Sequence, residues 1–378
     1  MKILHVSADP KWTGPAEPML NTILGLRARG HDVDLACPPP PLELRPQLLE
    51  HARERGVEAV HLLEHARGYR PLRDHAEVRR LRALLREGAY DIVHVHHTRD
   101  HLLSLLAARG GATRLVRSWH QGHPVPAVPW SRLLLGPRGA AGLVVLSSRL
   151  AEHACRSLGW PSRHVAVVPG VVDVDRFEPH EPNQRLRHDL GIAPEQRVIG
   201  VVARLQPHRR FDLLLEAFAR ALRRAPDLRL VVLGRGTRAL EVLHEPVAEL
   251  GLEHAVVRAG YRRDDYLEML SLFAALAFLV PGSDGSCRAV LEAMSMGIPA
   301  VVSRRGILPK IVKDRETGRV VAEDPEELAN VFHELWCEPA RWQSFGKAAR
   351  EYVLGHHTIS QAAERLEGFY GDLFGDGG

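Results

Sequence analysis

Short apolar runs alternate with amphipathic segments along the first half of the chain. Each run has the length of a strand, and most are followed by a helical pattern before the next begins. The candidate strands are residues 2–7, 33–36, 57–63, 91–95, 115–118, 142–146 and 165–168. Alternation of strand and helix is typical of a parallel sheet with helices on both faces. We therefore predict a doubly wound α/β domain over residues 1–170.

The same pattern begins again after a polar, proline-containing stretch at residues 177–183. The candidate strands of the second half are residues 198–203, 228–233, 254–258, 275–279 and 299–302. A run of helices follows from residue 325 to residue 374. The chain has 378 residues, which is enough for two such domains. We predict a second doubly wound domain over residues 171–355, and a ligand cleft at the carboxyl ends of the strands.

The composition excludes several classes of protein. Hydrophobic residues make up 45% of the chain and charged residues 25%, which rules out a disordered or fibrous protein. The four cysteines form no CxxC pair and no disulfide framework, so a reducing cytoplasmic compartment is expected. The longest apolar run, residues 272–280, is about half as long as a membrane span. A cytoplasmic protein that can still dock on the inner face of the membrane is the prediction.

Charge is unevenly divided along the chain. The formal net charge is +4, but residues 1–170 alone carry 23 Lys and Arg against 15 Asp and Glu, a net of +8. A positive first half suggests an anionic partner, and compositional drift in an Arg-rich chain explains it equally well. The basic residues lack interleaved aromatic residues and no nucleic-acid motif appears. Nucleic acid is therefore not an expected partner.

Two loops that follow predicted strands carry groups suited to phosphate. Gly14 follows the first strand and opens a helix, where free N–H groups can bind an anion, although a plain turn is the simpler interpretation. Arg204 ends a strand and Arg209 begins the next helix, and two guanidinium groups suit a diphosphate. Surface arginines are the alternative. Gly234 lies in a short G-x-G that lacks the rest of a dinucleotide fingerprint.

The loop at residues 281–294 holds the strongest combination of groups. An apolar strand ends at Pro281, the loop contains Asp284, and a helix then carries Glu292 eight residues later. The amides near residues 286–288 lie at the start of this helix and form a second candidate anion site. Two carboxylates that flank an anion site can bind hydroxyl groups on either side of a diphosphate. That arrangement describes a nucleotide sugar.

This loop resembles the E-x7-E signature of the retaining glycosyltransferases of family 4, which have the GT-B fold. The family signature reads roughly P-S-x-x-E-G-F-G-x-x-x-x-E-A-M-A-x-G-x-P-V-V, and this chain has Asp284 for the first Glu and E-A-M-S-M-G-I-P-A-V from Glu292. Residues 204–218 resemble the family's R-L-x-x-x-K-G-x-D-x-L-L-x-A-F. Further family motifs, in order, are Gly14, R-G-H-D-V at residues 29–33, D-I-V-H-V-H at 91–96, His120 and V-P-G-V-V-D with F-E-P at 168–179. The resemblance extends from about residue 2 to residue 373.

The resemblance implies two Rossmann-like domains, with the last helix, residues 356–378, returning to the N-terminal domain. It implies sugar transfer with retention and without a metal, from a UDP-, GDP- or ADP-linked sugar, and no other cofactor. The implied acceptor is an anionic glycan or lipid-linked molecule, in the synthesis of bacterial lipopolysaccharide or a related polysaccharide. The remaining alternatives are a nucleotide-sugar epimerase or phosphorylase of the same fold, and a degenerate homologue without activity.

The resemblance also implies roles for single residues. The diphosphate would contact Gly14 and Arg204, Glu292 would bind ribose hydroxyls, and Asp284 would bind hydroxyls of the donor sugar, with His120 close to the reacting carbon. The expected catalytic residues are His120, Asp284, Arg204 and Arg209, and the expected donor-binding residues are Gly14, Gly234, Tyr261, Ser286, Cys287, Arg288 and Glu292. Two departures put the donor in doubt: Asp284 is one methylene shorter than Glu, and Ser-Cys-Arg at 286–288 replaces the family's F-G-x. Arg288 adds a cation suited to an acidic sugar or a second phosphate.

Histidines and arginines of the first half form further patterns. His94 and His96 alternate along a strand and so point to one face, but no acidic or Cys partner recurs at ligand spacing, and no metal site is expected. Residues 119–123 are better candidates for the acceptor side of the cleft. The helical segment 75–86 has Arg79, Arg82 and Arg86 on one side, which suits anionic lipid or a solvated face.

Overall fold

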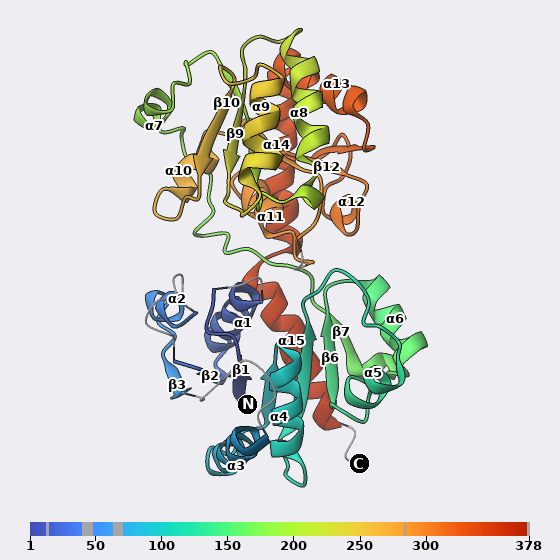
Figure 1. Ribbon diagram of the computed structural model, residues 1–378. Coiled ribbons are helices and arrows are strands. Elements are labelled where there is room, and N and C mark those ends of the chain that lie inside the picture. Colours follow the sequence, from blue (N-terminus) through green and yellow to red (C-terminus); the bar gives the residue numbers. More distant parts are fainter. Residues whose placement is uncertain (13–14, 40–47, 63–70, 283–284, 376–378) are drawn as a thin grey trace. The chain divides into compact units, whose positions relative to one another are not determined.

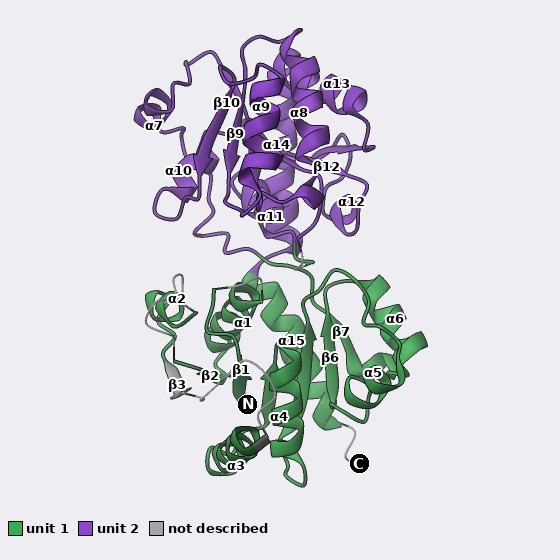
Figure 2. Cartoon of the chain, viewed as in Figure 1, with its two compact units in different colours: residues 1–171, 283–286, 359–378 green, residues 172–282, 287–358 purple. Residues whose placement is uncertain are grey.

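The computed structural model describes residues 1–12, 15–39, 48–62, 71–282 and 285–375, whose helices and strands are shown in Figure 1. The chain divides into two compact units (Figure 2). Unit 1 comprises residues 1–171, 283–286 and 359–378, and unit 2 comprises residues 172–282 and 287–358. Each unit is built on a parallel sheet, as the alternation of strand and helix predicts.

Unit 1 contains a seven-stranded sheet in the order β3-β2-β1-β4-β5-β6-β7. Its strands are β1 (Lys2–Val6), β2 (Asp32–Cys37), β3 (Ala59–Leu62), β4 (Ile92–Val95), β5 (Arg114–Trp119), β6 (Gly142–Val145) and β7 (Val165–Val167). The strand order reverses between β1 and β4, where His5 pairs in register with His94. This switch point is the place where an open α/β sheet ordinarily binds a ligand.

Helices pack on both faces of the unit 1 sheet. They are α1 (Ala16–Ala28), α2 (Leu48–Glu54), α3 (Pro71–Glu87), α4 (Thr98–Ala108), α5 (Pro129–Leu134), α6 (Ser148–Leu158) and α15 (Ile359–Gly375), with a 3-10 turn η1 (Ser162–His164). One core joins strand residues such as Ile3 and Ile92 to α1 and α15. The final helix α15 lies beside α1 (Figure 1), and a Cβ on Gly25 would come within 2.9 Å of the Cβ of Ala363. A glycine at this position therefore lets the two helices approach closely.

Unit 2 contains a six-stranded sheet in the order β10-β9-β8-β11-β12-β13. Its strands are β8 (Arg197–Val202), β9 (Leu228–Leu233), β10 (Val256–Gly260), β11 (Ala275–Phe278), β12 (Ala300–Ser303) and β13 (Gly318–Val321). The order reverses between β8 and β11, so this pair forms the switch point of the second sheet. The sequence pattern did not predict β13, because its four residues include a Gly and an Arg and give no clear apolar run.

The helices of unit 2 pack against its sheet and form two apolar cores with it. They are α7 (Gln184–Asp189), η2 (Pro207–Arg209), α8 (Phe211–Leu222), η3 (Leu240–His244), α9 (Glu245–Glu249), α10 (Tyr266–Ser271), α11 (Arg288–Ser295), α12 (Leu308–Ile311), α13 (Pro325–Cys337) and α14 (Pro339–His356). In the part of the chain that the structure describes, no helix is both long enough and apolar enough to span a bilayer.

Candidate functional site

Two of the predicted arginines lie at the switch point of unit 2. Arg204 follows the end of β8 and is exposed. Arg209 donates a hydrogen bond from a guanidinium nitrogen to the carbonyl oxygen of Val280, just beyond β11, at 2.7 Å. Arg209 also lines a small cavity with Phe211 and the end of β11. Cationic groups therefore mark the carboxyl ends of the two strands where a diphosphate would be expected to bind.

The helices that follow β8 and β11 both begin at a residue in the left-handed backbone conformation. Arg210 caps α8 with φ 59°, and Cys287 caps α11 with φ 51°. This conformation costs a residue other than glycine about 1–2 kcal/mol. Arg210 stands where the family pattern R-L-x-x-x-K-G has its glycine. Such strain persists only where surrounding contacts hold the backbone, and it concentrates at functional sites.

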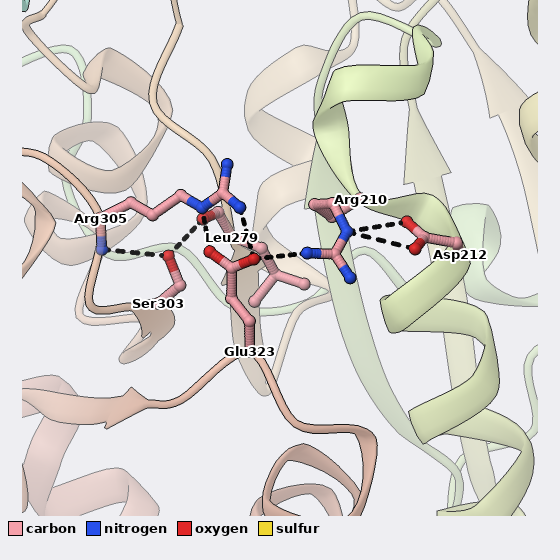
Figure 3. Close-up of polar contacts among 6 residues, drawn as sticks. All are labelled: Arg210, Asp212, Leu279, Ser303, Arg305 and Glu323. Carbon is pink, nitrogen blue, oxygen red and sulfur yellow. Dashed lines mark hydrogen bonds and ion pairs between the residues drawn. The ribbon is translucent and has the colours of Figure 1, made fainter.

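Ion pairs with two carboxylates hold the side chain of Arg210 (Figure 3). Its Nε donates to both carboxylate oxygens of Asp212, at 3.1 and 3.2 Å, and another nitrogen pairs with Glu323. Glu323 also pairs with Arg305, and the hydrogen bond from Arg305 is the main reason that the pKa of Glu323 is lowered. The guanidinium of Arg210 is thus committed to carboxylates, which leaves Arg204 and Arg209 as the candidate ligands for an anion.

The carboxylate of Glu292 is buried on α11 and held by two neighbours. The Tyr266 hydroxyl donates to one carboxylate oxygen at 2.7 Å, and Arg288 Nε lies 3.2 Å from the other. Only 3% of Glu292 is exposed. A carboxylate accepts hydrogen bonds at both of its oxygens, so the hydroxyl groups of a ligand are chemically suited to it. Sequence reasoning missed Tyr266, because nothing in its helix marks a residue that reaches Glu292.

Gly234 has a structural reason to be glycine. Its φ is 153°, and a Cβ there would lie 1.8 Å from the carbonyl oxygen of Ala203. At this position the backbones of the loops that follow β8 and β9 approach too closely for a side chain to fit between them. Tyr261, after β10, is half exposed, and the guanidinium carbon of Arg235 lies 4.5 Å from the centre of its ring. This pair offers a flat surface at the same edge of the sheet.

The loop before α11 is shared between the two units. Cys287 belongs to unit 2, and its side chain is buried in an apolar core. Ser286 belongs to unit 1 and packs on Gly170, where a Cβ would lie 2.7 Å from the Ser286 carbonyl oxygen. Gly14 and Asp284 lie outside the described residues, and their roles stay predictions.

His120 and Ser286 line one cavity of unit 1. The cavity lies at the ends of β5, β6 and β7 and includes residues of α1 and α15, such as Thr22 and Leu366. The carbonyl oxygen of His120 accepts a hydrogen bond from the Gly285 amide at 2.8 Å. The structure therefore brings a predicted catalytic histidine and a predicted binding residue together within unit 1.

A buried cluster of histidines extends from His120 to the switch point of unit 1. His5, His94 and His96 are each at most 4% exposed, and one ring nitrogen from each lies within 4.8 Å of those of the other two. Burial lowers the pKa of His5 and of His120 to about 3, and lowers the pKa of His94 and His96 well below the ordinary value. Sequence reasoning found His94 and His96 but missed His5, which alternates with Ile3 along β1.

Comparison with known proteins places this chain in a family. The family model described as "Glycosyltransferase Family 4" matches residues 14–176, and "Glycosyl transferases group 1" matches residues 182–352. A GDP-mannose-dependent α-(1-6)-phosphatidylinositol monomannoside mannosyltransferase of Mycolicibacterium smegmatis is 32% identical over 278 residues, which cover 70% of this chain and 72% of that protein. The chain belongs to the family 4 glycosyltransferases. It is an enzyme that transfers a sugar from a nucleotide sugar.

Other relatives and solved structures are consistent with this family 4 glycosyltransferase. A D-inositol 3-phosphate glycosyltransferase of Streptomyces bingchenggensis is 27% identical over 293 residues, covering 71% of this chain but only 64% of that relative. A glycosyltransferase structure from Rickettsia africae has a TM-score of 0.84 at 15% identity, covering 99% of each chain. Anabaena HepE in complex with UDP and glucose has a TM-score of 0.78 at 17% identity, covering 97% of this chain and 98% of that one. These structural neighbours confirm the predicted two-domain, Rossmann-like fold.

Proposed function

We propose that this glycosyltransferase acts with retention and without a metal, and that unit 2 binds the diphosphate and ribose of its donor. The observation that carries the proposal is Glu292, a buried carboxylate held by Tyr266 and Arg288 at the helix that follows the switch-point strand β11. A carboxylate at this place suits the hydroxyl groups of a ribose. Arg204 and Arg209, at the ends of the same pair of strands, suit the diphosphate.

The proposed chemistry relies on fixed positive groups. Negative charge develops on the leaving diphosphate as the bond to the sugar breaks. The guanidinium groups of Arg204 and Arg209 and the amides at the start of α11, near Cys287 and Arg288, stabilise that charge. These groups supply what a metal ion supplies in other transferases. We assign binding of the donor sugar to Asp284 and His120, and a further phosphate contact to Gly14, in line with the family motifs.

For the donor, we propose a nucleoside-diphosphate hexose, with GDP-mannose as the first candidate. Its support is the similarity to the Mycolicibacterium relative, a GDP-mannose-dependent mannosyltransferase. The UDP bound in Anabaena HepE supports UDP-sugars as the second candidate. The half-exposed ring of Tyr261 and the guanidinium of Arg235 stacked on it provide a flat surface against which a base can pack.

For the acceptor, we propose an anionic molecule that carries a phosphate or a lipid. Residues 1–170 have a net charge of +8, and Arg79 and Arg86 of α3 are exposed. The relatives named for inositol phosphate and phosphatidylinositol support a phosphoinositol acceptor more directly than a lipopolysaccharide. The α5 segment adds Trp130, 72% exposed, beside Arg132, a combination suited to a membrane surface.

Isothermal titration calorimetry of GDP, UDP and their sugars tests the donor site. Replacement of Glu292 with Ala should weaken nucleotide binding by at least about tenfold, since hydrogen bonds to a charged group contribute roughly 1.5–3 kcal/mol. Glu292→Gln keeps the shape of the side chain and guards against a folding defect. Glu268→Ala, an exposed carboxylate on α10, is the matched control and should bind normally. Unchanged affinity in Glu292→Ala and Glu292→Gln would contradict the assignment.

A further inference from the structure

Three of the clustered histidines form a continuous chain of hydrogen bonds. His5 Nδ1 lies 3.0 Å from His96 Nε2, and His96 Nδ1 lies 2.9 Å from His120 Nε2. In both pairs the ring centres are 5.2 Å apart and the ring planes differ by only 18° and 21°. These distances are what two nearly coplanar imidazoles require when an N–H···N hydrogen bond joins them edge to edge. One end of the chain is buried at the switch point, and the other end is His120, which lines the cavity.

The arrangement is unlike a metal site, although His5, His94 and His96 are close enough to share an ion. A zinc ion needs one unprotonated nitrogen from each histidine, all directed at one point. His94 Nδ1 is instead hydrogen bonded to the Tyr370 hydroxyl at 2.5 Å, and His94 Nε2 to the Ser118 hydroxyl at 2.7 Å. His94 therefore packs against the chain of histidines, with ring centres 4.8 Å from those of His5 and His96, without belonging to it.

Neutral imidazoles in such a chain can be protonated in only two ways. Each ring has one N–H donor and one bare acceptor nitrogen, and each link needs one proton, so all the protons must point in the same direction. If they point toward His120, then His120 Nε2 accepts and its Nδ1 carries the proton. If they point toward His5, then His5 Nε2 carries a proton. His5 Nε2 is buried and has no hydrogen-bond partner among the described residues.

The buried end decides between these two states. An N–H group buried without an acceptor is rarer in proteins than an acceptor left without a donor. We propose that His5 and His96 are positioning residues that hold His120 in the Nδ1–H tautomer, so that His120 presents a neutral hydrogen-bond donor to an oxygen of the donor sugar. The proposal rests on the sugar-binding role proposed above for His120. A neutral imidazole held in one tautomer is a known way for an enzyme to polarise an oxygen without adding a charge.

Nuclear magnetic resonance of the full chain with ¹⁵N-labelled histidine tests the tautomer without any turnover. Long-range ¹H–¹⁵N correlations at pH 7.5 should show a bare Nε2 and a protonated Nδ1 on His120, and His96→Leu should convert this to a mixture of tautomers. Stoichiometric ZnCl₂ should leave the resonances of His5, His94 and His96 in place. The Nε2–H tautomer or an imidazolium on His120, an unchanged His120 in His96→Leu, or a zinc-induced shift of the cluster would overturn the proposal.

A pair of amide substitutions at His96 separates positioning from packing. The Asn amide lies near the position of Nδ1 and can still bond His120, whereas the Gln amide lies near Nε2 and can bond only His5. We expect His96→Gln and His96→Leu to lower kcat roughly tenfold or more with a smaller change in KM for the donor, and His96→Asn to retain most of the rate. Equal rates in the Asn and Gln variants would overturn the proposal.

A matched control comes from the same cluster. His94 is as buried as His96 and packs on the same rings but lies outside the chain of hydrogen bonds. His94→Leu should lower stability and leave the tautomer of His120 as in the wild type. A change of tautomer in His94→Leu would show that packing alone sets it. If the wild type has the expected tautomer but transfers no sugar, the proposed function is wrong. The conclusion that His5 and His96 fix the tautomer of His120 then stands, and only its role in sugar transfer is lost.

Discussion

The two sheets of this protein reverse their strand order at chemically opposite places. In unit 2, Arg204 and Arg209 follow β8, Arg209 bonds the carbonyl oxygen of Val280 beyond β11, and Glu292 lies on the helix after β11. In unit 1, the corresponding pair, β1 and β4, carries buried neutral imidazoles, with His5 and His94 in register. The same topology therefore supports a charged site suited to a diphosphate in unit 2. In unit 1 it supports an uncharged cluster that, as proposed above, positions His120 as a hydrogen-bond donor. The reversal of strand order determines where a site can form, and the residues at the strand ends determine its chemistry.

The charged switch point should show the largest effect on activity. Arg209→Ala removes a guanidinium placed at the ends of β8 and β11, and we expect kcat/KM to fall roughly 100-fold, as for loss of one stabilising donor at a developing charge. Arg223→Ala, an exposed arginine after α8, is the control. Initial rates with saturating acceptor measure both. A loss in Arg209→Ala of less than about threefold would remove Arg209 from the diphosphate site.

The neutral switch point should show itself in the dependence of stability on pH. The pKa of His5 is lowered to about 3, and the pKa values of His94 and His96 are also low, because burial penalises the charged ring. The unfolded chain therefore binds more protons below about pH 6.5, and unit 1 loses stability as the pH falls. We expect roughly 1 kcal/mol per buried histidine between pH 7.5 and 5.5.

Hydrogen–deuterium exchange of the full chain measures this difference between the units. Peptides from β1 and β4 should lose protection at pH 5.5, after correction for the intrinsic exchange rate, whereas peptides from β8 and β9 should keep it. The pKa of Glu323 in unit 2 is lowered, so its stabilising ion pairs persist below pH 5.5. The groups around the unit 1 cluster include Arg117 and Tyr370 as well as the four histidines. His94→Leu should reduce the pH dependence, and equal losses in both units would contradict the comparison.

The strained start of α8 should show the smallest effect. Arg210→Gly relieves a left-handed backbone but loses ion pairs with Asp212 and Glu323, which are partly exposed. These contributions nearly cancel, so the free energy of unfolding should change by less than about 1 kcal/mol. Arg210→Ala loses the same pairs and keeps the strain, and should be about 1 kcal/mol less stable than Arg210→Gly. Urea unfolding of the two variants gives the difference, and equal stabilities would show that the backbone is unstrained.

Local patterns were enough to predict the parallel sheets, because each buried strand is an apolar run of its own. They failed at β13, where Gly318–Val321 is short and partly polar. They also indicated Arg209 and Glu292, since each follows a strand and opens or lies in the next helix. Local patterns could not predict contacts between residues that are distant in sequence. His5 is 91 residues from His96, and Tyr266 is 26 residues from Glu292. Which side chains meet across elements depends on register and packing, which no single segment encodes.

The contrast between the two switch points is tested most directly by measuring nucleotide affinity and turnover in one variant of each unit. Calorimetry with GDP-mannose or UDP-glucose, run beside initial-rate assays, compares Glu292→Gln of unit 2 with His96→Leu of unit 1. We predict that Glu292→Gln loses nucleotide affinity at least about tenfold, whereas His96→Leu binds the nucleotide normally but turns over roughly tenfold more slowly. Normal nucleotide binding by folded Glu292→Gln, or loss of that binding in folded His96→Leu, would contradict it.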